Sequence, residues 1–261
     1  MLGDPIAHSL SPEMHNAAIA GLGLDAVFIA LHVAPAALPV ALEGCAALGI
    51  AGNVTVPLKQ GAAAHIAHLT PLAKTLGAVN TFWIADGALQ GDNTDVPGLD
   101  ETLAALGAPP PWLVVGTGGS ARAVAAVAAR RNVPLVVHAR SPDRVAAFCA
   151  WARALDGAPD ARPDDGQPVG TLINATPLGL APGDPEPLPG ADRRGAGAAL
   201  DLVYRRGETA WVRACRASGL RAADGRSLLV AQGAHAFERF FPGVRAPREI
   251  MRAAVARALT P

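Results

Sequence analysis

Apolar runs along the chain are interrupted by proline, glycine and short polar segments at spacings that predict alternating helices and strands. Ser11-Pro12 has the pattern of a helix start, with Ser11 as the N-cap of a helix that runs toward Gly21. Asp86-Gly87 lies between two apolar runs and predicts a β-hairpin. The other elements expected in the first hundred residues are a strand at 26–31, a helix at 35–48, a strand at 50–54, a helix opened by Pro57, a helix capped by Thr70, and a helix that follows Asp95 as far as Leu106.

A Gly-Ala-Pro-Pro-Pro break at 107–111 separates this part from a second one. Apolar strands alternate there with helical segments, which predicts a parallel, doubly wound sheet. A polar, proline-rich stretch at 156–168 interrupts the alternation. The expected elements are strands at 112–115, 133–137, 169–173 and 198–203, helices at 122–131 and from Ser141-Pro142, and further helices beyond Gly207. The whole chain is therefore expected to be an α/β protein.

Composition places the chain among globular proteins, because 261 residues of which 51% are hydrophobic can bury a large core in one or two domains. No apolar run reaches the ~20 residues that a membrane helix requires. The start of the chain has neither a basic region nor an apolar segment typical of a signal peptide, so we expect a cytoplasmic location. The three cysteines, Cys45, Cys149 and Cys215, lie far apart in apolar segments and are expected to be buried free thiols.

Charge is distributed unevenly although the net charge is zero. Residues 1–121 hold two lysines, no arginine and nine acids, a net charge of −7, whereas residues 122–261 hold 20 arginines and 13 acids, a net charge of +7. This asymmetry indicates two parts with different ligands. The arginines are dispersed and aromatic residues make up only 4%, which disfavours nucleic acid and favours a phosphorylated small molecule.

A glycine-rich loop follows the first strand of the second part. Gly116, Gly118 and Ala121 have the spacing of the dinucleotide fingerprint, in which glycines allow a tight turn and a helix N-terminus faces the pyrophosphate. Such loops are weak evidence alone, but here an apolar strand precedes the loop and a helix follows it. The second part is therefore predicted to be a Rossmann-type nucleotide domain, with cofactor contacts from Gly116, Thr117, Gly118, Gly119, Ser120 and Ala121.

Two arginines follow the second strand of this domain, where NAD-specific proteins carry an acid for the ribose 2′-hydroxyl. Arg140 and Arg144, together with Ser141, suit a 2′-phosphate. The alternative, that both are solvated arginines at a helix start, is disfavoured because the helix dipole repels cations there unless an anion is present. NADP is therefore the favoured cofactor, while Asp143 keeps NAD use open.

Lys59 is one of only two lysines in a chain with 20 arginines, and it lies in a polar segment at a predicted helix start. Lysine, unlike arginine, can give up a proton, and the positive end of a helix dipole favours that loss. Reduction of a carbonyl requires such a proton donor, and Asp95 is the candidate carboxylate that orients it. The alternative role of Asp95 is the N-cap of the helix after Thr94. A metal site at His65 and His68 has little support, so no metal is expected.

Eight short motifs together give the chain a resemblance to the shikimate dehydrogenases. They run in the order of that family across nearly the whole chain. The motifs are Gly3 to Pro12 (GDPIAHSLSP), Asn53 to Lys59 (NVTVPLK), Gly77 to Thr81 (GAVNT), Asn93-Thr94-Asp95, the glycine loop, Asn174 to Gly179 (NATPLG), Asp201 to Tyr204 (DLVY), and Gln232-Gly233-Ala234.

The resemblance implies a mixed α/β substrate domain at 1–100, completed by C-terminal helices at 228–261, and an NADP-binding Rossmann domain at 101–227. It implies reversible reduction of 3-dehydroshikimate to shikimate with NADPH, with Lys59 and Asp95 as the catalytic pair. Ser9 and Ser11 match hydroxyls that bind the substrate carboxylate, which agrees with the absence of arginine before position 122. Positions that match ring-hydroxyl contacts are Asn53, Thr55, Asn80, Tyr204 and Gln232; those that match cofactor contacts are Arg140, Ser141, Arg144, Thr176, Leu202 and Gly225.

Some positions depart from the family pattern. Ala139 stands where the family usually has Asn, Leu180 where it has Met, and Arg205-Arg206 where it has Pro. Only Met1-Leu2 precede Gly3, so the first strand of the family is expected to be shortened or missing. A quinate or dual-specificity quinate/shikimate dehydrogenase stays open, as does a non-catalytic NADP-binding sensor, which the intact Lys59 and Asp95 disfavour. Small molecules are the only partners expected, and the protein is expected to be a monomer or a homodimer.

Overall fold

The computed structural model describes residues 1–7, 9–181, 183–188 and 195–260. The chain divides into two compact units. The first unit comprises Met1–Gly98 and Leu229–Ala258, and the second comprises Leu99–Leu228 with Leu259–Pro261. The chain passes between the units within two helices, α5 (Asp95–Leu106) and α9 (Arg226–Phe240), rather than through loops. The C-terminal helical segment therefore returns to the unit in which the chain began.

The first unit is built on a four-stranded mixed sheet with the strand order β3-β5-β6-β4. Its centre is the hairpin of β5 (Thr81–Ala85) and β6 (Ala88–Asp92), which confirms the prediction from the Asp86-Gly87 turn. Both turn residues have positive φ, 52° and 71°, as a two-residue hairpin turn requires. The flanking strands are β3 (Gly52–Asn53), antiparallel to β5, and β4 (His68–Leu69), parallel to β6.

The helices of the first unit begin mostly where proline predicted them. They are α1 (Ser11–Gly21), α2 (Leu38–Leu48), α3 (Lys59–His65), α4 (Pro71–Leu76), α9 from Leu229 onward, and α10 (Arg248–Leu259), with a short 3₁₀ turn at Pro35–Ala37. Thr70 caps α4 as predicted, since its Oγ1 accepts from the backbone N–H of Ala73 at 3.2 Å. The N-cap prediction for Ser11 is wrong: α1 begins at Ser11 itself, and its cap position is Leu10.

The strand expected at 26–31 is also wrong in its extent. Only β2 (Leu31–His32) forms, and it pairs in parallel with β1 (Leu2–Gly3). Farther upstream, the side chain of Asn16 donates to the Phe28 carbonyl and accepts from the Phe28 N–H, both at 2.8 Å. These bonds satisfy the backbone that a longer strand would have paired.

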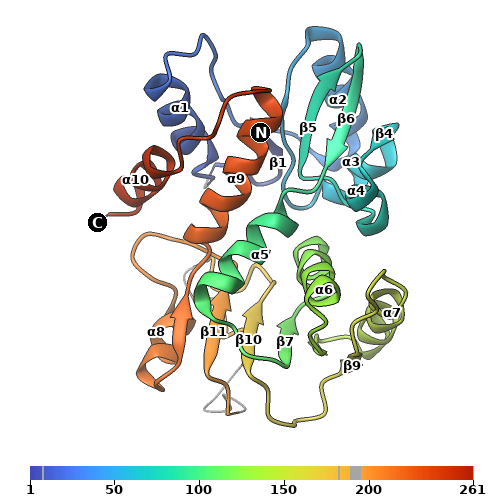
Figure 1. The fold of residues 1–261 in the computed structure, drawn as a ribbon, viewed down its shortest axis with the longest axis vertical. Helices are drawn as coiled ribbons and strands as arrows, with labels where there is room; N and C mark the ends of the chain where they lie inside the picture. Colours follow the sequence, from blue (N-terminus) through green and yellow to red (C-terminus); the bar gives the residue numbers. More distant parts are fainter. Residues whose placement is uncertain (8, 182, 189–194, 261) are drawn as a thin grey trace. The chain divides into compact units, whose positions relative to one another are not determined.

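The second unit contains a six-stranded, all-parallel sheet with the strand order β12-β11-β10-β7-β8-β9. In Figure 1, β11, β10 and β7 lie side by side in this order. Numbered from the start of this unit, the order is 6-5-4-1-2-3, which is that of the Rossmann dinucleotide fold and confirms the predicted fold class. The strands are β7 (Trp112–Val115), β8 (Leu135–His138), β9 (Ala161–Pro163), β10 (Thr171–Asn174), β11 (Ala198–Asp201) and β12 (Arg221–Ala223); the helices are α6 (Gly119–Arg131), α7 (Pro142–Arg153), α8 (Ala210–Ala217) and the start of α9.

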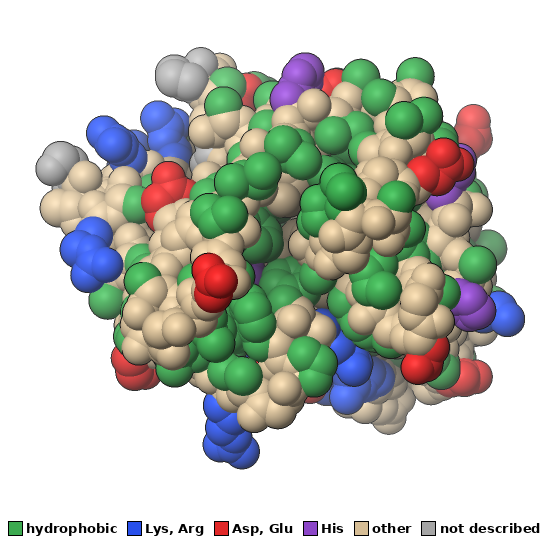
Figure 2. Space-filling view, turned by 90° about the horizontal axis from the view of Figure 1, so that it is seen from above, with side chains coloured by type: hydrophobic (Ala, Val, Ile, Leu, Met, Phe, Trp, Pro, Cys, Tyr) green, Lys and Arg blue, Asp and Glu red, His purple; other side chains and the backbone are tan. Residues whose placement is uncertain are grey.

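Apolar side chains fill the interior of both units and also reach the surface. Cys45, Cys149 and Cys215 are buried free thiols, as predicted. Val27 and Leu48 are 74% and 75% exposed. Hydrophobic side chains spread over much of the face seen in Figure 2, and charged side chains lie mostly toward its periphery. Within the described part of the chain, no helix is long and apolar enough to cross a bilayer.

A histidine lies inside an aromatic cluster of the first unit. His15 on α1 is 1% exposed and stacks on Phe28 with ring centroids 4.3 Å apart, while Phe237 and Phe240 of α9 lie at 6.0 and 5.7 Å. Neither ring nitrogen has a hydrogen-bond partner among the described residues. Burial lowers the pKa of His15 from 6.5 to about 3, so the ring is neutral in the folded protein.

We expect His15 to make the protein less stable in mild acid. Below pH 6.5 the unfolded chain binds a proton that the folded chain refuses until about pH 3, so the free energy of unfolding falls across that window. The slope is about 1.4 kcal/mol per pH unit, or about 2 to 3 kcal/mol between pH 7 and pH 4.5. When the free energy of unfolding is measured with denaturant at pH 7 and at pH 4.5, the decrease should be smaller by this amount in His15→Phe than in the wild type. The exposed His68→Gln variant should keep the full loss, and equal losses in all three proteins would contradict the prediction.

Candidate active site

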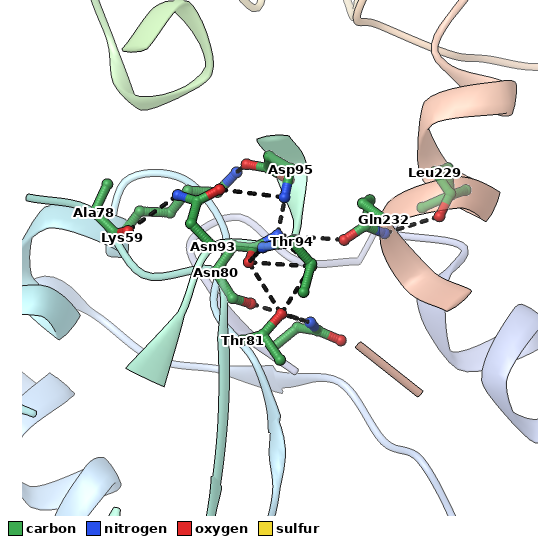
Figure 3. A network of polar contacts seen from close by, with 10 residues as sticks. Lys59, Ala78, Asn80, Thr81, Asn93, Thr94, Asp95, Leu229 and Gln232 are labelled. Carbon is green, nitrogen blue, oxygen red and sulfur yellow. Dashed lines mark hydrogen bonds and ion pairs between the residues drawn. The ribbon is translucent and has the colours of Figure 1, made fainter. Parts of the chain in front are cut away.

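Lys59 and Asp95 form a direct ion pair in the first unit (Figure 3). Lys59 is the first residue of α3 and Asp95 the first residue of α5, and Lys59 Nζ donates to Asp95 Oδ2 at 2.6 Å. Their side chains are 13% and 11% exposed. The two residues predicted to form a proton donor and its carboxylate partner are therefore in contact, 36 residues apart in sequence and largely shielded from water.

The carboxylate of Asp95 is held by side chains and not by the helix that it begins. Its Oδ2 accepts from Lys59, and its Oδ1 accepts from Asn80 Nδ2 at 2.8 Å. The backbone N–H of Asp95 donates to Asn93 Oδ1 at 3.2 Å. Because α5 begins at Asp95 itself, the alternative interpretation of Asp95 as an N-cap is wrong. The carboxylate is thus oriented toward the lysine.

Asn80, at the start of the hairpin, is the centre of the surrounding network (Figure 3). Its Oδ1 accepts from the Thr94 N–H at 2.7 Å and from the Thr81 hydroxyl at 3.0 Å. Its Nδ2 lies within hydrogen-bond distance of Thr94 Oγ1, Asp95 Oδ1 and Gln232 Oε1, at 3.0, 2.8 and 3.4 Å. Thr81, Asn93 and Thr94 had no predicted role, although all three lie within the motifs. Asn80 therefore supports Asp95 in addition to any contact with a substrate.

Asn53 carries an unsatisfied acceptor beside this network. Its Nδ2 donates to the Asn80 carbonyl at 3.1 Å and to Thr81 Oγ1 at 3.0 Å. Its Oδ1 is buried and accepts no hydrogen bond from the described residues. Buried polar atoms are nearly always paired in native proteins. An unpaired acceptor at this position fits a ligand that brings a hydroxyl donor.

Ser9, Ser11 and Thr55 also lie in the first unit. Ser9 and Ser11 are 8% and 2% exposed, and Ser9 Oγ accepts from the Ser11 N–H at 3.3 Å. Thr55 follows β3, and its N–H donates to the Leu2 carbonyl at 2.9 Å. A side chain on Gly3 would meet the Thr55 methyl group at 2.4 Å, which explains why glycine occupies that position. Tyr204 belongs to the second unit, so its predicted contact with the substrate stays a prediction.

The two glycines of the fingerprint have different surroundings. Gly116 has a φ of 112°, and a Cβ there would lie 3.1 Å from Thr176 Cγ2 and 3.2 Å from the Ala175 carbonyl oxygen. Gly118 is the N-cap of α6, and nothing lies within 4 Å of the position that its Cβ would take. The open side of Gly118 leaves room for a phosphate to approach the backbone at the helix N-terminus. The loop therefore fits a dinucleotide. Of the remaining predicted loop residues, Thr117 precedes this cap, and Gly119, Ser120 and Ala121 form the first turn of α6.

Thr176, Leu202 and Gly225 come from loops that follow neighbouring parallel strands, β10, β11 and β12. A Cβ on Gly225 would lie 2.3 Å from the Leu202 carbonyl oxygen, so this close approach requires glycine. Asn174 and Asp201, paired across β10 and β11, hold the loops: Asn174 Oδ1 accepts from the Thr176 hydroxyl at 2.6 Å, and Asn174 Nδ2 donates to Asp201 at 2.8 Å. Burial raises the pKa of Asp201.

Arg140 and Arg144 are exposed around the start of α7, and neither guanidinium has a partner among the described residues. Ser141 is the N-cap, and its Oγ accepts from the Arg144 N–H at 3.4 Å. The positive end of the helix dipole repels two unpaired cations at a helix N-terminus unless an anion lies with them. The arrangement therefore fits a cofactor that carries a phosphate at this position.

A carboxylate that the sequence did not suggest lies near the end of β8. Asp164 follows β9, and its Oδ2 lies 2.9 Å from Nδ1 of His138, the last residue of β8. Because β9 was not predicted, a contact between Asp164 and His138 could not be expected from the sequence. His65 Nδ1, in the proposed histidine pair, lies 2.7 Å from the Gly61 carbonyl oxygen of its own helix. Among the residues that the structure describes, no group of three or more histidines, cysteines and acids could hold a metal ion.

Comparison with known proteins identifies the family. The sequence model of the "Shikimate dehydrogenase substrate binding domain" matches residues 1–82, and that of the "Shikimate 5'-dehydrogenase C-terminal domain" matches residues 225–256. The chain is 40% identical to "Shikimate dehydrogenase (NADP(+))" of Thermus thermophilus over 265 residues, which cover 99% of this chain and 97% of the relative. The chain belongs to the shikimate dehydrogenase family.

Two further matches agree with this assignment. The protein of the same name from Anaeromyxobacter dehalogenans strain 2CP-1 is 41% identical over 99% of this chain and 94% of its own length. The crystal structure of shikimate 5-dehydrogenase from Thermus thermophilus, in complex with NADP(H) and shikimate, aligns with a TM-score of 0.89 and 38% identity over 99% of this chain and 98% of that one. The family resemblance expected from the eight motifs is thereby confirmed.

The unpaired arginines lead to a prediction on cofactor choice. Arg140→Ala should weaken NADP binding by roughly tenfold to 10²-fold, because hydrogen bonds to charged groups contribute about 1.5–3 kcal/mol and about 1.4 kcal/mol corresponds to a factor of ten. NAD binding should hardly change. Dissociation constants of both cofactors test this, with Arg153→Ala at the other end of α7 as the control. Equal losses for NADP and NAD would reject the assignment and favour Asp143 as a ribose ligand.

Proposed function

We propose that this chain is an NADP-dependent shikimate dehydrogenase, which reversibly reduces 3-dehydroshikimate to shikimate in the biosynthesis of aromatic amino acids. The observation that carries the proposal is the largely buried Lys59–Asp95 pair at 2.6 Å. Reduction of a carbonyl to an alcohol requires a proton beside the developing alkoxide, and this pair provides one within a family whose named relatives perform that reaction.

In this mechanism Lys59 donates the proton to the substrate oxygen, and receives one in the reverse direction. An ammonium group has three N–H donors, so the bond to Asp95 leaves others for the substrate. Asp95 holds the lysine in place, and Asn80 and Asn93 hold Asp95. The pair is thus arranged before the substrate arrives, which lowers the cost of orienting it in the transition state.

The substrate contacts are assigned to polar side chains of the sequence motifs. We assign the substrate carboxylate to the hydroxyls of Ser9 and Ser11. Ser9 Oγ donates to Met1 Sδ at 3.1 Å, a weak acceptor that a carboxylate can readily replace. The ring hydroxyls are assigned to Asn53, whose buried Oδ1 lacks a donor, and to Thr55, Asn80, Tyr204 and Gln232.

The second unit fits NADP through Gly118, which leaves its helix N-terminus open, and through Arg140 and Arg144, which have no partner among the described residues. When bound, the cofactor supplies the hydride. We assign the adenosine phosphate to Arg140, Ser141 and Arg144, and the nicotinamide to the loops of Thr176, Leu202 and Gly225. The assignment of the substrate to the first unit and of NADP to the second is part of this proposal.

Initial rates with shikimate and quinate, each with NADP and NAD, test the proposal. Shikimate with NADP should give the highest kcat/KM. Preference for quinate would make the chain a quinate dehydrogenase with the same catalytic pair, and cofactor binding without turnover of either substrate would make it a sensor. A cytoplasmic location and a monomeric or homodimeric state are further parts of the proposal, which fractionation and sedimentation would check.

Lys59→Ala is expected to lower kcat by ~10² to 10⁴ fold, the usual contribution of a positioned general acid or base, and to leave the affinity for NADP nearly unchanged. Lys59→Arg should fail as well, because guanidinium does not release its proton at neutral pH. Lys74→Ala removes the only other lysine and is the matched control, which should keep full activity. Near-normal kcat in Lys59→Ala would remove Lys59 from the mechanism.

Replacement of both Ser9 and Ser11 by alanine should raise the KM for shikimate at least tenfold, since each hydrogen bond to a charged group contributes about 1.5–3 kcal/mol. The KM for NADP should stay the same. Ser11 is not the N-cap of α1, so a large loss of stability is not expected. A lower melting temperature with an unchanged KM for shikimate would mean that the two hydroxyls serve the fold and not the substrate.

A further inference from the structure

Two polar side chains of α9 contact residues at the hairpin of β5 and β6. Gln232 and Arg239 are seven residues apart on this helix, about two turns, so they lie on the same face. Gln232 Oε1 accepts from Asn80 Nδ2, and Arg239 Nη2 donates to Asp92 Oδ2 at 2.9 Å. Asn80 directly precedes β5, and Asp92 ends β6 opposite Thr81, so one helix face contacts both chains at the open end of the hairpin.

Asp92, the last residue of β6, is held from three sides. Its Oδ1 accepts from the Thr70 hydroxyl at 2.7 Å and from the Asn93 N–H at 2.8 Å, and its Oδ2 accepts from Arg239. The Asp92 side chain is only 9% exposed. A carboxylate so far from water needs a cation or several donors, and Arg239 supplies the charge.

The guanidinium of Arg239 is itself fixed by a second contact. Its Cζ lies 5.1 Å from the centre of the Trp83 ring, and Trp83 is on β5 of the same hairpin. A cation over an aromatic ring is attracted by the negative face of the ring. Half of the Arg239 side chain is exposed, so solvent weakens its bond to Asp92 but does not remove it. The two contacts together give the guanidinium one defined position.

A short chain of hydrogen bonds connects Asp92 to the catalytic carboxylate. The Asn93 N–H donates to Asp92, and Asn93 Oδ1 accepts from the Asp95 N–H at 3.2 Å. Asn93 Nδ2 donates to the Ala78 carbonyl at 3.0 Å, which anchors this link to the segment between α4 and β5. Asp95 then meets Lys59. The position of Asp92 therefore fixes the beginning of the segment Asn93-Thr94-Asp95, and with it the position of Asp95.

We propose that Arg239 is a positioning residue for the Lys59–Asp95 pair, acting through Asp92 and Asn93. The proposal rests on the proposed function for its effect on catalysis, and on geometry alone for its effect on the pair. Loss of Arg239 leaves the buried Asp92 carboxylate without its cation, and a buried charge that loses its partner relaxes toward other donors or water. The backbone of Asn93 moves with it, and Asp95 loses its alignment with Lys59.

The test compares Arg239→Gln and Arg239→Lys with a matched control, Arg252→Gln. Arg252 is also in the first unit and pairs with Glu249 at 2.5 Å, but both members of that pair are well exposed on α10 and distant in sequence from the catalytic loops. Melting temperatures of all variants are measured first. Arg239→Lys keeps the charge at Asp92 and provides a milder variant if Arg239→Gln is poorly folded.

Steady-state kinetics with shikimate and NADP give the first result. Arg239→Gln should lower kcat by roughly tenfold to 10²-fold, the scale for a small misplacement of catalytic groups, with the KM for NADP unchanged. Arg239→Lys should recover much of that loss, and Arg252→Gln should match the wild type. A purely structural role would lower the melting temperature and the amount of active enzyme, but would leave kcat per folded molecule unchanged.

The second result uses the presence of only two lysines in the chain. Acetylation of Lys59 and Lys74 by an amine-selective reagent can be followed by mass spectrometry, with the exposed Lys74 as the internal reference. Arg239→Gln should raise the Lys59/Lys74 rate ratio several-fold because the ion pair with Asp95 loosens, whereas Arg252→Gln should leave the ratio at the wild-type value.

The kinetic result and the labelling result together distinguish a failure of the Arg239 proposal from a failure of the proposed function. An unchanged ratio together with an unchanged kcat in Arg239→Gln overturns the role of Arg239, while shikimate activity of the wild type still supports the proposed function. If the wild type does not turn over shikimate, the proposed function fails. The labelling ratio then decides the role of Arg239 alone, since an increase supports it and no change rejects it.

Discussion

The structure of the first unit is organised around the requirement that a largely buried carboxylate be fully paired. Asp95 lies in contact with Lys59, and an ion pair with side chains 13% and 11% exposed costs desolvation energy that only good geometry offsets. The second oxygen of Asp95, Oδ1, accepts from the Asn80 amide. The other hydrogen bonds of that amide are made with Thr81, Thr94 and Gln232. The polar motifs of the sequence are thus mutually dependent, since each supplies a donor or acceptor that another would otherwise lack.

Glycine permits the helices to approach this network closely. A Cβ at Gly98 of α5 would lie 2.7 Å from the backbone nitrogen of Gln232 on α9, and a Cβ at Gly233 would lie 2.2 Å from the Met14 methyl group on α1. Both distances are shorter than any real contact of a Cβ atom. At Gly98 the close atom belongs to the backbone, so the approach of α5 to Gln232 on α9 requires glycine, whereas the Met14 side chain at Gly233 is flexible and could shift. Glycine at these positions also has a cost, because it loses more conformational entropy on folding than any other residue.

Much of the architecture could be predicted from local signals. The Asp86-Gly87 hairpin, the Thr70 cap and the glycine loop each fix the backbone within a few residues, and each is present. The short edge strands β9 and β12 were missed because three residues carry no periodicity, and β9 ends in a proline that only an edge strand tolerates. The strand at 26–31 was overpredicted, because the Asn16 side chain and not a neighbouring strand satisfies the backbone of Phe28 in its middle. The contact between Arg239 and Asp92 spans 147 residues and had no local signal at all.

The return of the C-terminal helices to the first unit also changes how the net charge is divided between the two units. Divided by sequence, the two parts carry −7 and +7, but the first unit gains five arginines from residues 229–258 and holds nine acids against seven cations, a net charge of −2. The second unit is then +2, so net charge distinguishes the two units only weakly. Selectivity has to come from individual cations. Arg239 is committed to Asp92, and Arg252 to Glu249. Residues 229–258 also bring Arg245, Arg248 and Arg257 to the first unit, so a lack of arginine no longer supports the assignment of a substrate carboxylate to Ser9 and Ser11. That assignment depends instead on the burial of both serines and on the weak sulfur acceptor that Ser9 contacts.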